Sequence, residues 1–112
     1  MADFLISIAT YKRPDLLADL LRSLEPEVAG EDVRIVVVDN HAEGTAREVC
    51  ETSPLDIDYV VEPRPGIAAA RNCGLDRVAA DDRFLIFVDD DERVHPGWLR
   101  ALADAQRQYD AD

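Results

Sequence analysis

The sequence has no long hydrophobic run and little positive charge, and these two absences exclude several classes of protein. No apolar run approaches the roughly 20 residues that a membrane-spanning helix needs. Only 12 lysine and arginine residues accompany 24 aspartate and glutamate residues, so the formal net charge is −12. This balance opposes binding to extended nucleic acid, because affinity for a phosphate backbone comes largely from basic side chains. A small anionic ligand remains compatible if a cation or a few local arginines meet it.

A targeting signal and a cysteine framework are also missing. The first residues lack the basic segment and long apolar core of a signal peptide, so the expected compartment is the cytoplasm. The two cysteines, Cys50 and Cys73, form no C-x-x-C motif, and both fall within helical patterns. We therefore expect two reduced, half-buried thiols rather than a disulfide or a metal site.

Short apolar runs alternate with helical patterns along the 112 residues, of which 47% are hydrophobic. The runs predict strands at 4–9, 33–38, 57–61 and 84–88, and the periodicity predicts helices at 15–30, 44–52, 67–80 and 96–109. Asp15 is expected to cap the first helix, and Pro26 with Gly30 to end it. This alternation predicts one α/β domain over residues 1–112, with a mostly parallel, Rossmann-like sheet of about four strands flanked by helices.

Polar and charged residues follow the predicted strands abruptly, and ligands of such sheets bind beyond the carboxyl ends of the strands. The first strand is followed by the segment 10–13, which contains Thr10, Tyr11 and Arg13 and supplies a hydroxyl, an aromatic ring and two cations. The alternative for this segment is a plain turn before the helix. Asp39 ends the most hydrophobic strand and could accept hydrogen bonds from a nucleotide base or a ribose hydroxyl. Its alternative is a strand-end cap of nearby backbone amides.

Four acids follow the fourth predicted strand, from Asp89 to Glu92. If the segment stays extended, Asp89 and Asp91 share one side and Asp90 faces the other. Two carboxylates on one side repel each other unless a cation joins them. Mg²⁺ or Mn²⁺ accepts one or two carboxylates and leaves positions for phosphate oxygens and water. The alternative is a solvated acidic loop that favours the N-terminus of the next helix.

Arg71 is an unusual member of the third predicted helix, whose first turns contain Gly66 and three alanines. Helical spacing places it on one face with Leu75 and Val78, which we expect to be the core face. This placement predicts that Arg71 reaches the strand ends and contacts a phosphate or nucleotide. The alternative is an arginine that extends to the surface or pairs with an acid. We expect His41 and His95 to be polar loop residues and Trp98 to belong to the core.

Four motifs, in this order and at these spacings, resemble family 2 glycosyltransferases of the GT-A fold. They are ISIATYKRP at 6–14, VVVDN at 36–40, GIAAARN at 66–72 and FVDDDE at 87–92. They are similar to the family's opening strand, its base-contacting aspartate, its G-x-x-x-A-R-N segment and its D-x-D metal motif. The resemblance covers essentially the whole chain, and four motifs in register are specific where any one would not be.

The resemblance implies a nucleotide-diphospho-sugar ligand, often a UDP-sugar, with Mg²⁺ or Mn²⁺, and transfer with inversion at the sugar carbon. It also implies a set of site residues. Thr10 and Tyr11 would line the base pocket with Arg13 nearby, and Asp39 would hold the base edge. Arg71 would reach the base or phosphate region. Asp89 would contact the ribose or sugar and the metal, Asp90 would add supporting charge, and Asp91 would bind the metal.

One departure from the family concerns length. Members run well beyond 112 residues, and their second half carries the acceptor site and the catalytic base, for which no acid here can be named. We therefore expect the donor-binding part of a longer protein, in the cytoplasm or at the inner membrane face, rather than a stand-alone remnant. The unknown acceptor would be a sugar, lipid or protein. The sheet edge left open predicts self-association.

Three other functions compete with this interpretation. A non-catalytic module that binds a nucleotide-sugar or a metal would share the same residues. A sugar-nucleotidyltransferase would carry a glycine-rich first loop, whereas residues 10–14 contain no glycine. A phosphoacceptor receiver domain would carry its acid pair after the first strand, and Lys12 is in the wrong place for that function.

Overall fold

Strands and helices alternate throughout residues 4–79 and 82–110, which the computed structural model describes. The strands are β1 (Phe4–Thr10), β2 (Val33–Asp39), β3 (Ile57–Val61) and β4 (Phe84–Asp89). The helices are α1 (Pro14–Val28), α2 (Arg47–Thr52), α3 (Ile67–Asp76) and α4 (Trp98–Asp110). The strands form one sheet in the order β3-β2-β1-β4, and every pairing is parallel. The predicted fold class is confirmed.

The register of the sheet brings the strand ends together. Thr10 is aligned with Asp39 across β1 and β2, and Ala9 is aligned with Asp89 across β1 and β4. Asp39 is in turn aligned with Val61 on β3. Because all four strands run in the same direction, the polar segments that follow them leave from the same edge of the sheet.

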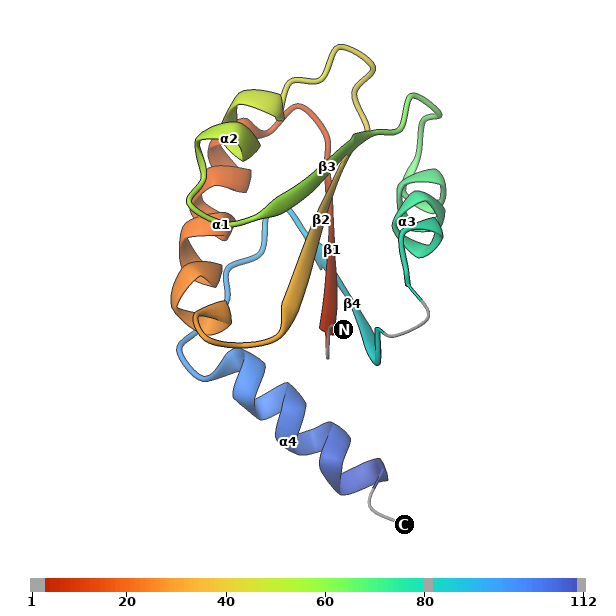
Figure 1. Ribbon diagram of the computed structural model, residues 1–112. Helices are drawn as coiled ribbons and strands as arrows, with labels where there is room; N and C mark the ends of the chain where they lie inside the picture. Colours follow the sequence, from red (N-terminus) through yellow and green to blue (C-terminus); the bar gives the residue numbers. More distant parts are fainter. Residues whose placement is uncertain (1–3, 80–81, 111–112) are drawn as a thin grey trace.

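Large aliphatic side chains fill the face of the sheet that α1 and α2 cover (Figure 1). Four leucines of α1 recur at three- and four-residue spacing and are at most 2% exposed, as an amphipathic helix requires. They pack against Ile6, Ile8 and Val37 of the sheet, and the partly buried Trp98 joins this core as predicted. α4 contacts α1 and extends beyond the sheet (Figure 1).

The opposite face of the sheet is covered by α3, which packs through small residues (Figure 1). Ala70 and Gly74 are its buried residues, and a Cβ added at Gly74 would lie 2.2 Å from Ser7 Oγ. The prediction that Leu75 and Val78 form the core face is therefore wrong, since they are 49% and 40% exposed. A helix this close to a sheet has room only for small side chains, so its bulky residues point away.

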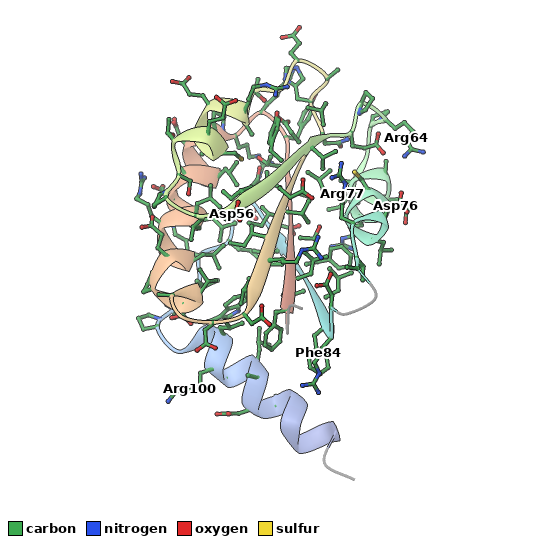
Figure 2. The ribbon with its side chains drawn as sticks, viewed as in Figure 1. Asp56, Arg64, Asp76, Arg77, Phe84 and Arg100 are labelled. Atoms are coloured by element: carbon green, nitrogen blue, oxygen red, sulfur yellow. The ribbon has the colours of Figure 1, made fainter. Side chains whose placement is uncertain are left out.

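The C-terminal end of α3 is connected to a neighbouring strand by an ion pair. Arg77, which follows the helix, forms an ion pair with Asp58 of β3 at 3.1 Å (Figure 2). Nearby, Arg34 of β2 forms an ion pair with the buried carboxylate of Asp82, just before β4. α3 ends at Asp76 rather than near residue 80, which lies outside the described residues.

The ends of the other helices differ from prediction by a few residues. α1 begins at Pro14 with Arg13 in the cap position, so the predicted cap by Asp15 is wrong. Pro26 lies within α1 rather than ending it, and the helix continues to Val28. α2 and α4 begin at Arg47 and Trp98, later than predicted, because hydrogen-bonded turns precede both.

The two cysteines are free thiols, with Cys50 buried and Cys73 half-buried. Burial raises the pKa of Cys50 to about 11, and the nearby carboxylates of Asp39 and Glu51 act in the same direction. Burial also raises the pKa of Cys73. Both side chains are therefore protonated at neutral pH and behave as small apolar residues.

Candidate functional site

A cavity of about 520 Å³ opens at the carboxyl-terminal edge of the sheet, where the loops after the strands converge. It extends from the end of β1 to the N-terminus of α3 and to the acidic segment after β4. Its lining residues are Ala9, Thr10, Tyr11, Arg13, Asn40, Pro65, Gly66, Ile67, Ala70, Asp89, Asp90 and Asp91. Six of the eight residues predicted for the site belong to this lining; Asp39 and Arg71 do not.

Asp90 joins the segment after β4 to the segment after β1. Its side chain is buried, and its Oδ2 accepts hydrogen bonds from Thr10 Oγ1 at 2.9 Å and from the Tyr11 N–H at 3.3 Å. Arg13 Nη1 lies 3.5 Å from Asp90 Oδ1 and partly offsets the buried charge. Buried carboxylates are tolerated when they are hydrogen-bonded and paired in this way. Asp90 therefore holds the β1 side of the cavity in place.

The segment from Tyr11 to Arg13 turns sharply between β1 and α1. Lys12 adopts a left-handed backbone conformation with φ of 55°, which is uncommon for a residue with a side chain. Tyr11 is 52% exposed at the mouth of the cavity, and its ring meets that of His41 edge-on at 5.8 Å. His41 and the exposed His95 are loop residues, as predicted. The result is an accessible aromatic ring beside a buried hydroxyl.

The acidic segment after β4 does not stay extended. β4 ends at Asp89, and a turn closes with a hydrogen bond from the Glu92 N–H to the Asp89 carbonyl oxygen at 3.1 Å. The extended geometry assumed for this segment is therefore wrong. Asp89 is half-buried and Asp91 is exposed, and both line the cavity.

Asp89 and Asp91 provide a donor set that suits a hard divalent cation bound together with a phosphate ligand. In the described part of the chain, no hydrogen bond or ion pair occupies the Asp89 carboxylate, and only Arg13 approaches that of Asp91, at 3.9 Å. Among the same residues, no cluster of three or more acidic, histidine or cysteine side chains could hold a metal alone. Mg²⁺ commonly takes one or two protein carboxylates and completes its shell with phosphate oxygens and water.

Asp39 is fully buried and caps the strand end, which was the alternative to contact with a ligand. Its Oδ1 accepts a hydrogen bond from the His41 N–H, and its Oδ2 accepts from the Ala46 N–H and from the Tyr59 hydroxyl at 2.6 Å. Burial raises the pKa of Tyr59, and the hydrogen bond to Asp39 adds to this effect. In this arrangement the Asp39 carboxylate faces Tyr59 and the turn before α2 rather than the cavity.

The β3–α3 loop, which we define as residues 62–66, forms the opposite side of the cavity. Figure 2 shows Arg64 at the outer end of this loop, near the start of α3. Arg64 Nε donates to the buried Glu62 carboxylate at 3.0 Å, and these side-chain hydrogen bonds lower the pKa of Glu62. Asn40 connects the loop to β2 through its side chain. This side of the cavity is built from backbone groups and a neutral amide.

α3 begins at this loop without a side-chain cap. Gly66 occupies the cap position with φ of 105°, and its carbonyl oxygen accepts the first hydrogen bond of the helix, from the Ala70 N–H. The N–H groups at the start of a helix have no partner within the helix and carry partial positive charge. Because Gly66, Ile67 and Ala70 line the cavity, this end of α3 provides a surface that favours an anion.

Arg71 lies outside the cavity lining, on the exposed surface of α3. Its guanidinium is 5.6 Å from the centre of the Phe87 ring on β4, which is itself 39% exposed. The expected placement on the core face is wrong because Ala70 and Gly74 occupy that face. A phosphate contact by Arg71 stays a prediction.

Sequence reasoning missed several lining residues, among them Asn40 and Ile67. Asn40 was visible as a polar residue directly after a strand, but an asparagine carries no charge or metal preference that would single it out. Ile67 is 55% exposed in the cavity wall, and its apolar side chain was expected only to begin the helix. Ala9 was missed as well, because a small residue contributes space rather than chemistry.

Comparison with known proteins decides the family. The family described as Glycosyl transferase family 2 matches residues 5–112. The chain belongs to glycosyl transferase family 2. The succinoglycan biosynthesis protein ExoM of Rhizobium meliloti is 44% identical to it over 110 residues, covering 91% of this chain and 34% of that protein. ExoW of the same organism is 31% identical, covering all of this chain and 36% of that protein.

Solved structures of other proteins share the fold of this chain. The crystal structure of S. aureus TarS 1–349 superposes with a TM-score of 0.77 at 23% identity, covering 96% of this chain and 33% of that chain. Its complex with UDP gives a TM-score of 0.70 at 26% identity and covers 99% of this chain and 32% of that chain. The chain thus spans about a third of the length of the curated relatives it matches. None of the described helices is long and apolar enough to cross a membrane.

Proposed function

We propose that the cavity binds a nucleotide-diphospho-sugar, with UDP as the expected nucleotide, and that this domain serves as the donor-binding part of a glycosyltransferase. The observation that carries the proposal is the pairing of two features across one cavity of about 520 Å³. The carboxylates of Asp89 and Asp91 lie on one side, and the uncapped N-terminus of α3 lies on the other. The likeness to the UDP complex of TarS supports the same ligand.

The two sides of the cavity suit the two charged parts of such a ligand. A diphosphate would meet the free N–H groups of α3 directly, because a helix N-terminus favours an anion. It would meet Asp89 and Asp91 only through a divalent cation, since carboxylates and phosphates repel each other. Asp89 and Asp91 would hold Mg²⁺ or Mn²⁺ at this position, and such a cation leaves places for phosphate oxygens. Arg13, whose side chain is 53% exposed, would add positive charge nearby.

The nucleoside would occupy the part of the cavity beside β1. Tyr11 offers an exposed ring on which a base can stack, and Thr10 is placed next to it by Asp90. Asp39 is expected to contact the base only if its present hydrogen bonds rearrange, because it is fully buried. Arg71 would have to leave the Phe87 ring to reach a phosphate.

The chemistry follows from the family. When bound, the cation stabilises the negative charge that develops on the departing nucleoside diphosphate. The residues described here would bind and orient the donor and keep its sugar carbon accessible to the acceptor, with inversion at that carbon. The catalytic base and the acceptor site would lie in other parts of a longer protein.

Calorimetric titration with UDP, with and without Mn²⁺, tests the proposal. We expect binding that requires Mn²⁺ and is lost in Asp91→Ala, because that variant removes a cation ligand without disturbing a buried contact. Asp56→Ala provides a matched control, since Asp56 is exposed, does not line the cavity and lies apart from Arg64 in Figure 2.

Titration with GDP and dTDP under the same conditions establishes the choice of nucleotide. Metal-independent binding, or no binding of any of the three nucleotides, would sink the proposal. Equal loss of binding in Asp91→Ala and Asp56→Ala would also count against it, because general charge rather than a cation site would then explain the effect.

A further inference from the structure

Asn40, the residue that follows β2, connects several parts of the cavity wall. Its Nδ2 donates to the carbonyl oxygens of Glu62 at 2.9 Å and Arg64 at 2.7 Å, and its Oδ1 accepts from the Gly66 N–H at 3.2 Å. Its backbone N–H donates to the Thr10 carbonyl oxygen at 2.8 Å. One residue thereby connects the ends of β1 and β2 to the β3–α3 loop and to the start of α3.

The partners of Asn40 fix the orientation of its amide group. Two carbonyl oxygens face one end of the amide and one N–H group faces the other, so only one of the two possible orientations satisfies all three. Aspartate has the same shape but offers no donor, and alanine offers neither donor nor acceptor. The site therefore specifies asparagine by hydrogen bonding rather than by size.

The rest of the β3–α3 loop has few connections to the sheet. Within the described residues, its other hydrogen bonds run from Arg64 to the Glu62 carboxylate, or attach Glu62 to β2 and Gly66 to α3. The part of the loop after Glu62 is thus held against β2 by Asn40. Pro65 and Gly66, which follow directly, line the cavity.

We propose that Asn40 is a positioning residue of the donor site. It sets the distance between the N-terminus of α3 and the acidic segment after β4, so that a diphosphate with its cation meets both sides of the cavity without first ordering the loop. This inference rests on the proposed function. Its physical basis is preorganisation, because a wall held in place in the free protein spares the ligand the cost of fixing it.

Two variants of Asn40 and one control test the proposal. Asn40→Asp keeps the acceptor for Gly66 and removes both donors, whereas Asn40→Ala removes all three side-chain hydrogen bonds without adding charge. Asn72→Asp makes the same charge change at an exposed position of α3. UDP affinity is measured by calorimetry with Mn²⁺ at a temperature where circular dichroism shows each variant to be folded. Amide hydrogen exchange is measured on the same samples.

We expect both Asn40 variants to bind UDP about tenfold more weakly than the unaltered chain, with Asn72→Asp unchanged. Exchange should rise at Arg64, Gly66 and the first residues of α3, while amides of β1 and β4 keep their protection. This local pattern separates positioning from a general loss of stability, which would raise exchange throughout the sheet.

Two results would overturn the inference alone. One is UDP binding within twofold of the unaltered chain in Asn40→Ala, whatever happens to Asn40→Asp, since added charge rather than lost hydrogen bonds would then explain any effect. The other is weaker binding with no change in amide exchange at Arg64, Gly66 and Ile67. Failure of the unaltered chain to bind any nucleotide would instead reject the proposed function and the positioning role together, so the two failures are distinguishable.

Discussion

The two sides of the cavity are held by different chemistry. On the β1–β4 side, a buried carboxylate, Asp90, accepts hydrogen bonds from Thr10 and from the Tyr11 N–H, with Arg13 nearby. On the α3 side, the neutral amide of Asn40 satisfies the backbone of the β3–α3 loop. Among the residues that line the cavity, charge is therefore concentrated on the β1–β4 side, since the Glu62 and Arg64 charges of the β3–α3 loop pair with each other and do not belong to the lining.

This difference matters for a ligand that carries negative charge. A carboxylate in place of Asn40 would bring negative charge close to the N–H groups of α3 that favour an anion. On the β1–β4 side, negative charge is useful because a divalent cation requires it. The asymmetry of the two sides thus matches a ligand made of a cation and a diphosphate.

The largest effect is expected on the β1–β4 side, where Asp90→Ala should lower the stability of the fold. The variant leaves the buried Thr10 hydroxyl and the Tyr11 N–H without their partner, and each orphaned group costs about 1–3 kcal/mol, so we expect a loss of about 2–6 kcal/mol in the free energy of unfolding. Urea unfolding of the purified chain measures it.

Asp90→Asn sharpens the same prediction, because asparagine keeps an acceptor for Thr10 but removes the charge near Arg13. A loss of about 1 kcal/mol is expected, consistent with a single net hydrogen bond. Asp76→Ala, at an exposed position, should change stability by less than about 0.5 kcal/mol. If Asp90→Ala were as mild as Asp76→Ala, the β1–β4 side would not depend on the buried carboxylate.

On the α3 side, a smaller effect is expected, on the way stability changes with pH. Hydrogen bonds from Arg64 lower the pKa of Glu62 below its usual value, so its contribution to stability is present above the pKa of an unfolded glutamate, about 4.3. That contribution is lost as the pH falls through the lower pKa of the folded state. Urea unfolding between about pH 7 and pH 3 should therefore show a smaller loss of stability in Glu62→Gln than in the unaltered chain.

Glu43→Gln is the matched control for this pH experiment, since Glu43 is exposed. It should lose stability on acidification as the unaltered chain does. A parallel course for Glu62→Gln and Glu43→Gln would mean that the contact between Glu62 and Arg64 contributes nothing to the stability of the α3 side.

The sheet was predictable because its signals are local and repeated. Apolar runs such as the one that ends at Asp39 mark strands covered on both faces, and alternation with helices leaves a parallel sheet as the simple outcome. The parallel direction of the strands then places Thr10, Asp39 and Asp89 at one edge, as the register shows.

The orientation of side chains at that edge was less predictable. Helical spacing placed Arg71 with Leu75 on a core face, but the glycine at 74 brings α3 so close to the sheet that only small residues fit there. Asp39 could equally bind a ligand or cap a strand until the partners from distant segments, such as the Tyr59 hydroxyl, were known. The orientation and role of these side chains depend on contacts between segments far apart in the sequence, and a local sequence pattern does not contain such contacts.

The same limit applies to the contacts of Asp90 within the acidic segment. The alternation rule separated Asp90 from Asp89 and Asp91, but a turn replaces the extended strand, and the Asp90 and Asp91 carboxylates approach the same Arg13 nitrogen, at 3.5 and 3.9 Å. What the rule did not contain is the hydrogen bond from Thr10, which makes Asp90 a structural carboxylate although it lines the cavity together with the other two.

Backbone amide chemical shifts measured during a titration with UDP and Mg²⁺ test the central claim most directly, because they locate the ligand on the molecule. The account predicts saturable shifts confined to residues 9–13, 40, 64–70 and 89–92, on both sides of the cavity, that disappear when Mg²⁺ is withheld. Shifts gathered on the face covered by α1 and α2, or the absence of any saturable shift, would contradict it.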